Sequence, residues 1–420
     1  MRGKLVLFVL VLGVAALLGG WEVSHNPQLF IGGPGNLAEL KSVPRHGGFD
    51  IPHEVRVCLT PAPVLRAQIT VDQPYTVQQP GIPPRQPLRP EAAGTNVVSL
   101  TPSGFRFGRR DIPGTSLEIT AEHSPAIWVE DHLYRGRVRL LRQGANKMIV
   151  INVLPLEDYV ASVVDGEMPA TFPEAARQAQ AIVARTYVLY QIQTARLSPL
   201  FDVYATTRSQ NYLGYQYRGR NGKRYAAESA SSRQVADTTA GMVCLWDGKL
   251  FCTYYTAVCG GRTAGGSAVF GDPVPTLESV DCSGCRDAEL YRWSEEIPLA
   301  EVSDRLKRYL SARGWPFDGL ASIRRIAEWQ TVQEPVFEAS DGRRGYRLSA
   351  LELRRLFSSA IHSYEFDVHM SQAQVVFDGQ GHGHGVGLCQ WGARGMARDG
   401  AGPLEILRHY YPGTDVVALE

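Results

Sequence analysis

The chain has 420 residues, of which 44% are hydrophobic and 20% charged, and its formal net charge is +1. This length is enough for a large buried core and for two or more domains, and the apolar fraction excludes a wholly disordered chain. A charge so close to zero gives no electrostatic reason to expect nucleic acid or an anionic membrane as a partner.

The amino terminus has the features of an export signal. Arg2 and Lys4 precede an apolar run over residues 5–18, which is shorter than the roughly 20 residues of a membrane-spanning helix. Two glycines follow, but there is no clean cleavage site and no cysteine that could take a lipid. Residues 1–20 therefore predict either a cleaved signal peptide or an uncleaved anchor in contact with the membrane. In both cases we expect the remainder to be exported.

The rest of the chain falls into three parts that differ in composition and hydrophobic pattern. Residues 21–50 are rich in Gly, Pro and Asn and indicate a linker. Residues 51–155 contain short β-branched runs broken by Pro and Gly, which indicates an antiparallel, strand-rich region, with a loop or insertion over the prolines of 74–94. Residues 156–420 mix helical and strand patterns. The sequence therefore predicts an α+β fold.

The best-defined helix is expected from Pro173 to about Gln193. Thr171 and Glu174 have the spacing of a capping box, and Pro173 falls in the first turn, where its missing N–H does no harm. Further elements are expected as a helix from 156 up to Gly166, helices over 299–312 and 349–358, and strands over 242–257.

Glu167 is the candidate for acid–base chemistry. It stands in the stretch D-G-E-M-P between two expected helices, with Met168 and Phe172 as apolar neighbours. Burial would raise the pKa of this carboxyl, and the start of the next helix would lower it. Full burial shifts a pKa by up to about 3–5 units and outweighs a dipole effect of about 0.3–1 kcal/mol, provided that the site is dry. A helix-capping carboxylate is the alternative.

Glycine occupies every second position from Gly379 to Gly387, with His382 and His384 between them. A phosphate cradle is disfavoured, because no G-K-[ST] follows and no Rossmann unit is evident. An extended strand would put both histidines on one face, as metal ligands or as partners of a bound ligand. Composition alone favours the third interpretation, in which glycines let two backbone segments approach closely.

The seven cysteines are an odd number, and export would permit disulfides. The pair Cys282-Ser-Gly-Cys285 is too close in sequence for a long-loop disulfide and suits a metal knuckle. Together with Cys259 and Cys389 it supplies the four ligands that a structural zinc ion requires, with His384 as a substitute for the fourth. The alternatives are a 282–285 disulfide or free buried thiols.

Three segments carry a family resemblance: LEDYVASVVDGEMPATFPEAARQAQAIVARTY, VCGGRT and GHGVGLCQWGARGMA. In this order they closely resemble the SpoIID/LytB family, which contains stage II sporulation protein D, from about Val55 to the end of the chain. The resemblance implies a lytic transglycosylase acting on peptidoglycan glycan strands, particularly strands stripped of stem peptides. Its catalytic glutamate would be that of E-M-P, which is Glu167. Some relatives instead enhance a cell-wall amidase, and some carry zinc.

A lytic transglycosylase needs one acid, whereas glycoside hydrolysis generally uses two carboxylates. Glu167 would protonate the leaving glycosidic oxygen and then accept the proton of the C6 hydroxyl of N-acetylmuramic acid, which closes a 1,6-anhydro ring. Asp165, two residues away around a glycine, does not define a second catalytic carboxylate. By position, the resemblance implies substrate contacts from Arg185, Tyr187, Gln210, Tyr212, His384, Gln390 and Trp391.

Alternatives stay open at several of these positions. Arg185 and Tyr187 are equally typical of packing and ion pairs within a helix, and Gln210 and Tyr212 of an ordinary strand edge. The chain also departs from the family at 257–261, where A-V-C-G-G replaces S-T-[SC]-G-G, and at His382, where relatives often carry a bulky or basic residue. These departures leave the substrate preference open.

Two other functions compete with the lytic transglycosylase. One is a non-catalytic cell-wall module that enhances an N-acetylmuramoyl-L-alanine amidase. The other is a hydrolase with a catalytic zinc ion, against which four thiolate ligands would count, because a closed site leaves no position for water.

Overall fold

The computed structural model describes residues 42–43, 53–80, 91–195, 197–326 and 335–419. These form two compact units. The amino-terminal unit contains the described residues up to Cys252 together with 415–419, and the carboxy-terminal unit contains residues 253–414. The apolar run at 5–18 and nearly all of the expected linker lie outside the described residues. In the part that is described, no helix combines the length and apolarity needed to cross a membrane.

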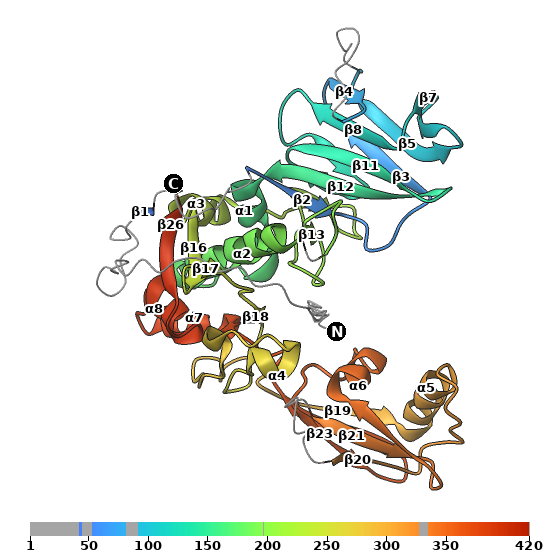
Figure 1. Cartoon of the computed structure of the whole chain (residues 1–420), viewed down its shortest axis with the longest axis vertical. Helices are drawn as coiled ribbons and strands as arrows, with labels where there is room; N and C mark the ends of the chain where they lie inside the picture. Colours follow the sequence, from blue (N-terminus) through green and yellow to red (C-terminus); the bar gives the residue numbers. More distant parts are fainter. Residues whose placement is uncertain (1–41, 44–52, 81–90, 196, 327–334, 420) are drawn as a thin grey trace. The chain divides into compact units, whose positions relative to one another are not determined.

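Two antiparallel-rich sheets make up the strand-rich region of the amino-terminal unit (Figure 1), with strand orders β13-β2-β12-β11-β8-β4 and β15-β14-β10-β9-β3-β5-β6-β7. Their bounds are β2 (Glu54–Cys58), β3 (Arg66–Val71), β4 (Tyr75–Gln78), β5 (Gly94–Thr101), β6 (Gly104–Phe107), β7 (Arg110–Pro113), β8 (Ser116–Ala121), β9 (Ile127–Val129), β10 (His132–Tyr134), β11 (Arg137–Gln143), β12 (Lys147–Pro155), β13 (Val203–Tyr204), β14 (Gln216–Arg218) and β15 (Arg224–Ala226). The expected antiparallel region is therefore confirmed.

Strand β12 shows why these sheets have a core on both sides. All seven of its inner residues are buried, as expected for an almost continuous apolar run that is covered on both faces. Val150 packs into the main core of the unit, whereas Ile149 and Ile151 pack in a second cluster with Cys58 and Phe201.

Three helices pack against one another in the same unit: α1 (Leu156–Glu167), α2 (Glu174–Thr194) and α3 (Ala230–Thr238). Beside them lies the sheet of β1 (Ser42–Val43), β26 (Asp415–Leu419), β16 (Met242–Trp246) and β17 (Lys249–Leu250). The long helix expected from Pro173 is confirmed as α2. The capping box is wrong, because the N-cap is Pro173 and Thr171 lies two residues before it. Helix α1 continues through Gly166 instead of ending there.

In the carboxy-terminal unit, β18 (Tyr255–Thr256) pairs in parallel with β25 (Leu388–Cys389). The short helix α4 (Gly266–Phe270), the 3₁₀ turn η3 (Pro275–Leu277) and the helices α7 (Gln390–Arg398) and α8 (Pro403–Tyr410) belong to this part of the unit. Cys389 is both the last residue of β25 and the N-cap of α7. One side chain thus joins the strand pair to a helix.

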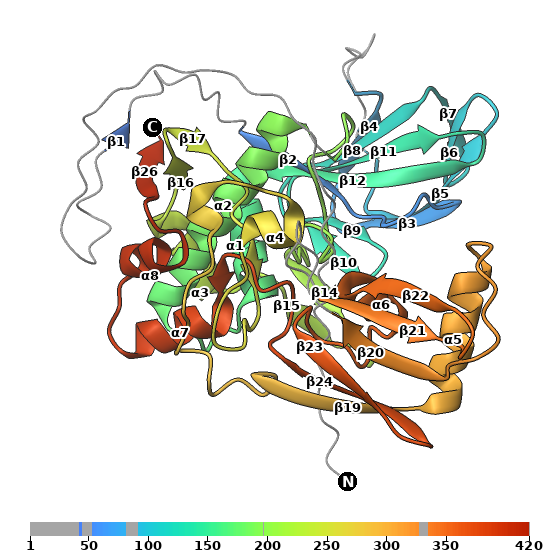
Figure 2. The same ribbon diagram turned by 60° about the horizontal axis from the view of Figure 1, so that its bottom comes forward.

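Residues 292–380 add two three-stranded sheets to that unit (Figure 2), with orders β19-β24-β23 and β20-β21-β22. The elements are β19 (Arg292–Pro298), α5 (Leu299–Ser311), β20 (Ser322–Ile326), β21 (Val336–Ser340), β22 (Gly345–Ser349), α6 (Ala350–Leu356), β23 (Phe366–Met370) and β24 (Gln374–Gln380). They share one apolar core. Helices α5 and α6 confirm the two expected helices, and the mixture of elements confirms the α+β class.

Candidate functional site

Glu167 is the last residue of α1, and its side chain is half-buried. Its Oε1 accepts a hydrogen bond from the main-chain N–H of Asn211 over 2.6 Å, and the Asn211 side-chain amide donates to the carbonyl of Gly166 over 2.6 Å. The carboxyl end of a helix carries unpaired carbonyls and the negative end of the dipole, which disfavours an anion. Asn211 offsets this unfavourable field, because it donates one hydrogen bond to the carbonyl of Gly166 and one to the carboxylate of Glu167.

Gly166 is required by this contact. A Cβ at Gly166 would lie 2.1 Å from the carbonyl oxygen of Asn211, closer than any real contact. The loop that carries Asn211 can therefore rest directly on the last turn of α1. Sequence reasoning singled out Gln210 and Tyr212 but missed Asn211, because only the fold brings its amide to Glu167.

Asp165 is fully engaged in structural contacts. It pairs with Arg177, and its Oδ2 accepts hydrogen bonds from the main-chain N–H of Ser229 over 2.6 Å and from the hydroxyl of Ser232 over 2.8 Å. Both serines lie at the beginning of α3, where an acceptor satisfies free N–H groups. The expectation of a single acidic group at this turn agrees with these contacts.

Two phenols lie within electrostatic reach of Glu167. Burial and then the charges of Cys252 and Glu167 raise the pKa of Tyr187, whose hydroxyl bonds to Ser209. Burial and then Tyr187 and Glu167 raise the pKa of Tyr159. Both side chains therefore stay protonated near neutral pH, and their hydroxyls bond to Gln210 and Ser209.

Gln210 is completely buried beneath this group. Its Oε1 accepts a hydrogen bond from the hydroxyl of Tyr159 over 2.9 Å, whereas its Nε2 has no hydrogen-bond partner in the described part of the chain. Tyr212 is also buried, with its hydroxyl donating to Asn152 over 2.6 Å and its ring against Tyr134 and Tyr159. Neither residue lies on a strand edge, because 210–214 is a loop.

Arg185 forms a buried ion pair. Its guanidinium is fully buried and donates to both carboxylate oxygens of Glu157, over 2.8 and 2.6 Å. Further donations go to the carbonyls of Met242 and Ala236. These contacts tie α2 to α1, α3 and β16. The structure thus favours the ion-pair role that the sequence left open for Arg185.

The four cysteines predicted as metal ligands come together in the carboxy-terminal unit. The sulfur atoms of Cys259, Cys282, Cys285 and Cys389 all lie within 4.8 Å of one another and are buried. All seven cysteines are free, so 282–285 is not a disulfide. A buried set of four thiols fits a metal, since thiolates are the ligands that structural zinc sites use. His384 is not a member of this group.

Neighbouring groups shape the cysteine cluster. The main-chain N–H groups of Cys259 and Gly392 both lie 3.3 Å from the sulfur of Cys389, and Gly392 is in the first turn of α7. The hydroxyl of Tyr410 lies 3.2 Å from the sulfur of Cys282. Donors around a sulfur favour a thiolate, which is the form that binds metal.

Glycines let the 282–285 knuckle rest on α7. A Cβ at Gly284 would lie 2.6 Å from the carbonyl oxygen of Gly392, and a Cβ at Gly392 would lie 2.4 Å from the sulfur of Cys282. A Cβ at Gly395 would meet Gly284 in the same way, 2.4 Å from its carbonyl oxygen. The G-A-R-G spacing in α7 therefore serves helix–knuckle packing.

The glycine stretch before α7 serves close backbone approach, which confirms the interpretation favoured by composition. Gly381, Gly383, Gly385 and Gly387 all have positive φ. A Cβ at Gly387 would lie 1.9 Å from the carbonyl oxygen of Tyr254, and one at Gly383 would lie 2.3 Å from the Thr256 hydroxyl. The segment it approaches is therefore part of the same unit, around β18.

His384 is buried and neutral. Its Nδ1 accepts a hydrogen bond from the main-chain N–H of Val386 over 3.0 Å, and its ring packs edge-on against Phe270. Burial, and then the charge of Arg354, lower the pKa of His384 to about 3. His382 is half-buried, with its ring 5.8 Å from that of His362.

The two remaining predicted residues begin α7. Gln390 is the first residue of the helix and is buried. Trp391 is half-buried; its main-chain N–H donates to the carbonyl of Ala257 over 3.1 Å, and the guanidinium of Arg394 lies 4.8 Å from the centre of its ring. Part of the indole of Trp391 is therefore accessible to solvent.

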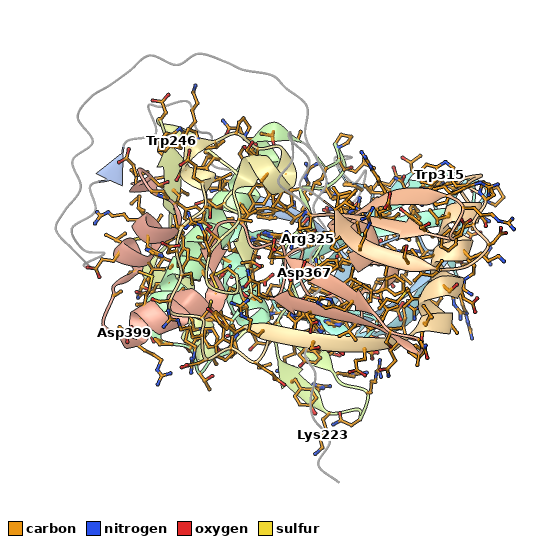
Figure 3. All side chains as sticks on the ribbon, turned by 90° about the horizontal axis from the view of Figure 1, so that it is seen from below. Lys223, Trp246, Trp315, Arg325, Asp367 and Asp399 are labelled. Carbon is orange, nitrogen blue, oxygen red and sulfur yellow. The ribbon has the colours of Figure 1, made fainter. Side chains whose placement is uncertain are left out.

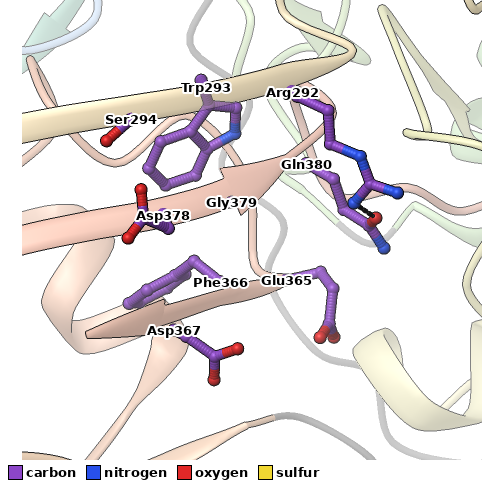
Figure 4. A pocket seen from close by; sticks show the side chains of 9 residues that line it. All are labelled: Arg292, Trp293, Ser294, Glu365, Phe366, Asp367, Asp378, Gly379 and Gln380. Atoms are coloured by element: carbon purple, nitrogen blue, oxygen red, sulfur yellow. Dashed lines mark hydrogen bonds between the residues drawn. The ribbon is translucent and has the colours of Figure 1, made fainter. Parts of the chain in front are cut away.

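A cavity of about 570 Å³ lies on the sheet β19-β24-β23 (Figure 4), lined by Arg292, Trp293, Ser294, Glu365, Phe366, Asp367, Asp378, Gly379 and Gln380. Arg325, from β20, lies 2.9 Å from a carboxylate oxygen of Glu365 and 3.3 Å from one of Asp367. None of the side chains predicted to bind substrate or metal lines this cavity. Sequence reasoning gave no signal for it.

In comparisons with known proteins, two family models match separate parts of the chain, one in each compact unit. A family model described as "Stage II sporulation protein" matches residues 144–246, and one described as "Domain of unknown function (DUF8618)" matches residues 277–387. The first contains Glu167 and its surroundings. The second contains the sheets of residues 292–380.

Three relatives illustrate the similarity. An uncharacterized protein of Brachyspira hyodysenteriae is 33% identical over 272 residues, which is 64% of this chain and 68% of the relative. Stage II sporulation protein D of Bacillus subtilis is 26% identical over 275 residues, 63% of this chain and 74% of the relative. A Bacillus subtilis protein named Amidase enhancer is 24% identical over 301 residues, 61% of this chain and 40% of the relative.

Proposed function

Because this chain belongs to the family of stage II sporulation protein D, we propose that it is an exported lytic transglycosylase. Its substrate would be the peptidoglycan glycan strand, cut between N-acetylmuramic acid and N-acetylglucosamine. The family and the relative named Amidase enhancer support a role at the cell wall. The observation that carries the enzyme proposal is the Glu167 carboxylate, which is half-buried and fixed through one oxygen by Asn211.

The geometry suits a single acid–base group. Asn211 orients the carboxylate of Glu167 through Oε1, and we assign the proton transfers to this carboxylate. Glu167 would donate its proton to the glycosidic oxygen as the bond to C1 breaks. The carboxylate would then accept the proton of the C6 hydroxyl as O6 bonds to C1, which yields the 1,6-anhydro ring without consuming water. Positioned proton transfer of this kind contributes about 10²–10⁴-fold to rates.

The other predicted residues differ in how directly they take part in this proposal. We assign Tyr187 to the surroundings of the carboxylate, because its neutral hydroxyl lies within electrostatic reach of Glu167. Arg185 and Tyr212 support the site from within the core. Trp391, whose indole is half-buried, is by itself a candidate for stacking on a sugar ring in the carboxy-terminal unit, whereas His384 and Gln390 are buried there.

We further propose that Cys259, Cys282, Cys285 and Cys389 hold a structural zinc ion. Four thiolates close the coordination sphere and leave no position for water, so the ion would supply a cross-link between segments and no hydrolytic chemistry. This argues against the alternative of a zinc hydrolase. The cross-link would join the knuckle to the ends of β18 and β25.

The test of the enzyme proposal is the variant Glu167→Gln, which keeps the shape of the side chain but cannot transfer the proton. Wild type should release 1,6-anhydro-muramyl products from peptide-stripped glycan strands, measured by mass spectrometry, and Glu167→Gln should release none. Glu174→Gln, at the exposed first residue of α2, is the matched control and should behave as wild type. Undiminished cleavage by Glu167→Gln would show that the assignment is wrong.

A second function is favoured by the relative named Amidase enhancer. In that case the protein would bind the wall and stimulate an N-acetylmuramoyl-L-alanine amidase without cutting glycan. Addition of the full chain to a purified amidase and sacculi distinguishes the two. An enhancer raises the rate of stem-peptide release, and Glu167→Gln stimulates as well as wild type.

A further inference from the structure

The hairpin formed by β14 and β15 concentrates positive charge. Residues 216–226 read QYRGRNGKRYA and contain four cations and no acid, in a chain whose net charge is only +1. Arg218, Arg220, Lys223 and Arg224 are all exposed, and Figure 3 shows Lys223 at the tip of this hairpin. None of the four forms an ion pair with a described carboxylate, whereas the exposed Arg106 and Arg110 of the same unit each have one.

Two of these cations face each other across the strands. Arg218 pairs directly with Arg224 in the β14–β15 register, an arrangement that is destabilising for like charges. Both guanidinium groups lie over the buried ring of Trp128, at 4.5 and 5.1 Å from its centre. A guanidinium that contacts an indole through its face can still donate its edge N–H groups to a carboxylate. An external anion would relieve this repulsion.

The opposite face of the same ribbon carries a row of aromatic rings. Tyr217 pairs with His132 on one side and with Tyr225 on the other. The rings stack with centroids 5.8 and 5.4 Å apart, and Tyr225 is 40% exposed. Because β15 is the edge strand of its sheet, one side of the row is open. The hairpin thus has aromatic rings on one face and cations on the other. These suit a polymer that carries both rings, which can stack on the aromatic side chains, and anionic groups, which can pair with the cations.

The hairpin is also continuous with the loop that holds Glu167. Asn211, which donates to that carboxylate, lies six residues before Tyr217 in the chain. An extended segment of that length spans at most about 20 Å. The loop is anchored by hydrogen bonds from Tyr215 to Leu133 and from Ser162 to Gly214. A polymer bound at Glu167 therefore has the hairpin within reach of its next sugars.

We infer that the β14–β15 hairpin is a binding surface for a glycan strand that carries free carboxylates. Its sugar rings would contact Tyr217 and Tyr225, and its carboxylates would pair with Arg218, Arg224 and the two cations of the turn. A strand without stem peptides bears a lactyl carboxylate on each N-acetylmuramic acid and has this chemistry. The identity of the glycan rests on the proposed function; the anionic, ring-bearing character of the ligand rests on the hairpin alone.

The test measures binding, in full-length protein that carries Glu167→Gln so that turnover does not interfere. Co-sedimentation with bead-immobilised, peptide-stripped glycan strands is compared for this protein and for a variant with Gln at 218, 220, 223 and 224. The control variant changes an equal number of exposed cations elsewhere, Lys147, Lys249, Arg308 and Arg347, to Gln. We expect the hairpin variant to bind about tenfold or more weakly and the control variant to bind normally.

Two measurements do not depend on the variant folding correctly. Immobilised strands whose carboxylates have been converted to methylamides should bind the unaltered hairpin weakly, and added salt should release the protein from untreated strands. Equal binding to amidated and untreated strands would overturn the inference. Equally tight binding of a polyphosphate, duplex DNA or anionic phospholipid vesicles would also overturn it, because the surface would then recognise charge without the sugar.

This test and the test of the enzyme proposal fail separately. If wild type releases anhydro products but the hairpin variant binds the stripped strands normally, the hairpin inference is wrong and the enzyme proposal stands. If the hairpin governs binding but wild type releases no anhydro products, the enzyme proposal is wrong and the binding surface stands.

Discussion

The main-chain N–H of Asn211 donates to Oε1 of Glu167 over 2.6 Å, while the side-chain amide of the same residue donates to the carbonyl of Gly166. One residue thus fixes both the carboxylate and the helix end that carries it. A Cβ at Gly166 would break this arrangement, since it would lie 2.1 Å from the Asn211 carbonyl oxygen. The relationship makes Asn211 a positioning residue in the proposed reaction.

Replacing Asn211 with Ala should lower kcat by about tenfold to a hundredfold and change KM little, because the loop loses the side-chain bond to Gly166 that holds the main-chain N–H of residue 211 against Glu167. Steady-state release of anhydro products measures both constants. Asn146→Ala, at an exposed turn position, is the control. A rise in KM at constant kcat would instead assign Asn211 to substrate binding.

Replacing Arg185 with Gln should destabilise the amino-terminal unit by about 3–5 kcal/mol, because the change leaves Glu157 without its buried partner. Urea unfolding followed by circular dichroism measures this loss. Arg308→Gln, at an exposed position of α5, should change the free energy of unfolding by less than about 0.5 kcal/mol. A folded Arg185→Gln protein of normal stability but with a raised KM would restore the substrate-contact role to Arg185.

Replacing Cys282 with Ser should abolish the binding of about one zinc ion per chain, because a structural site requires all four ligands. Metal content by mass spectrometry and the Tm of the protein before and after chelation give the result. Cys58→Ser removes a buried thiol outside the cluster and should keep the metal. Full metal content in Cys282→Ser would disprove the four-thiolate site.

His384 should make stability depend on pH. Its pKa in the folded protein is about 3, below the value of about 6.5 in an unfolded chain. The unfolded state therefore takes up the proton first, so the stabilisation is complete above pH 6.5 and falls as the pH falls toward 3. Between pH 7 and 5 this group should remove about 2 kcal/mol from the free energy of unfolding.

The variant His384→Gln tests this assignment, because it cannot take up a proton. Urea unfolding at pH 7 and pH 5 should show a smaller loss for His384→Gln than for wild type, by about 2 kcal/mol. The exposed His123 offers the control variant His123→Gln, which should lose as much stability as wild type. Identical losses in His384→Gln and wild type would mean that His384 takes up its proton in the folded protein.

Two glycines of the stretch before α7 provide a matched pair. Gly385 and Gly387 have φ of 78° and 71°, so Ala at either position is strained by about 1–2 kcal/mol. At Gly385 the added Cβ meets only Ala264 at 3.4 Å, whereas at Gly387 it would lie 1.9 Å from the Tyr254 carbonyl oxygen. Gly387→Ala should therefore lower Tm clearly more than Gly385→Ala. Equal losses would show that the backbone of Tyr254 gives way freely.

Local patterns were enough to predict much of the fold. The hydrophobic spacing after Pro173 predicted α2, and the β-branched runs before Leu156 predicted the strands, because these elements follow from the periodicity of burial along the chain. The C-x-x-C spacing likewise identified Cys282 and Cys285 as metal ligands, since two thiols at this spacing are typical of structural zinc sites.

Tertiary structure decided what the individual side chains do. Arg185 and Tyr212 are as polar in sequence as any substrate ligand, but packing against Glu157 and Asn152 buries them. Asn211 reaches Glu167 from 44 residues away, and Arg218 and Arg224 gather over Trp128 through strand pairing. Sequence alone determined which segments form helices and strands, because those are local properties, whereas the four cysteines meet only in the fold. Which residues a side chain contacts, and whether it is buried, depend on segments that are distant in sequence, so only the folded chain decides them.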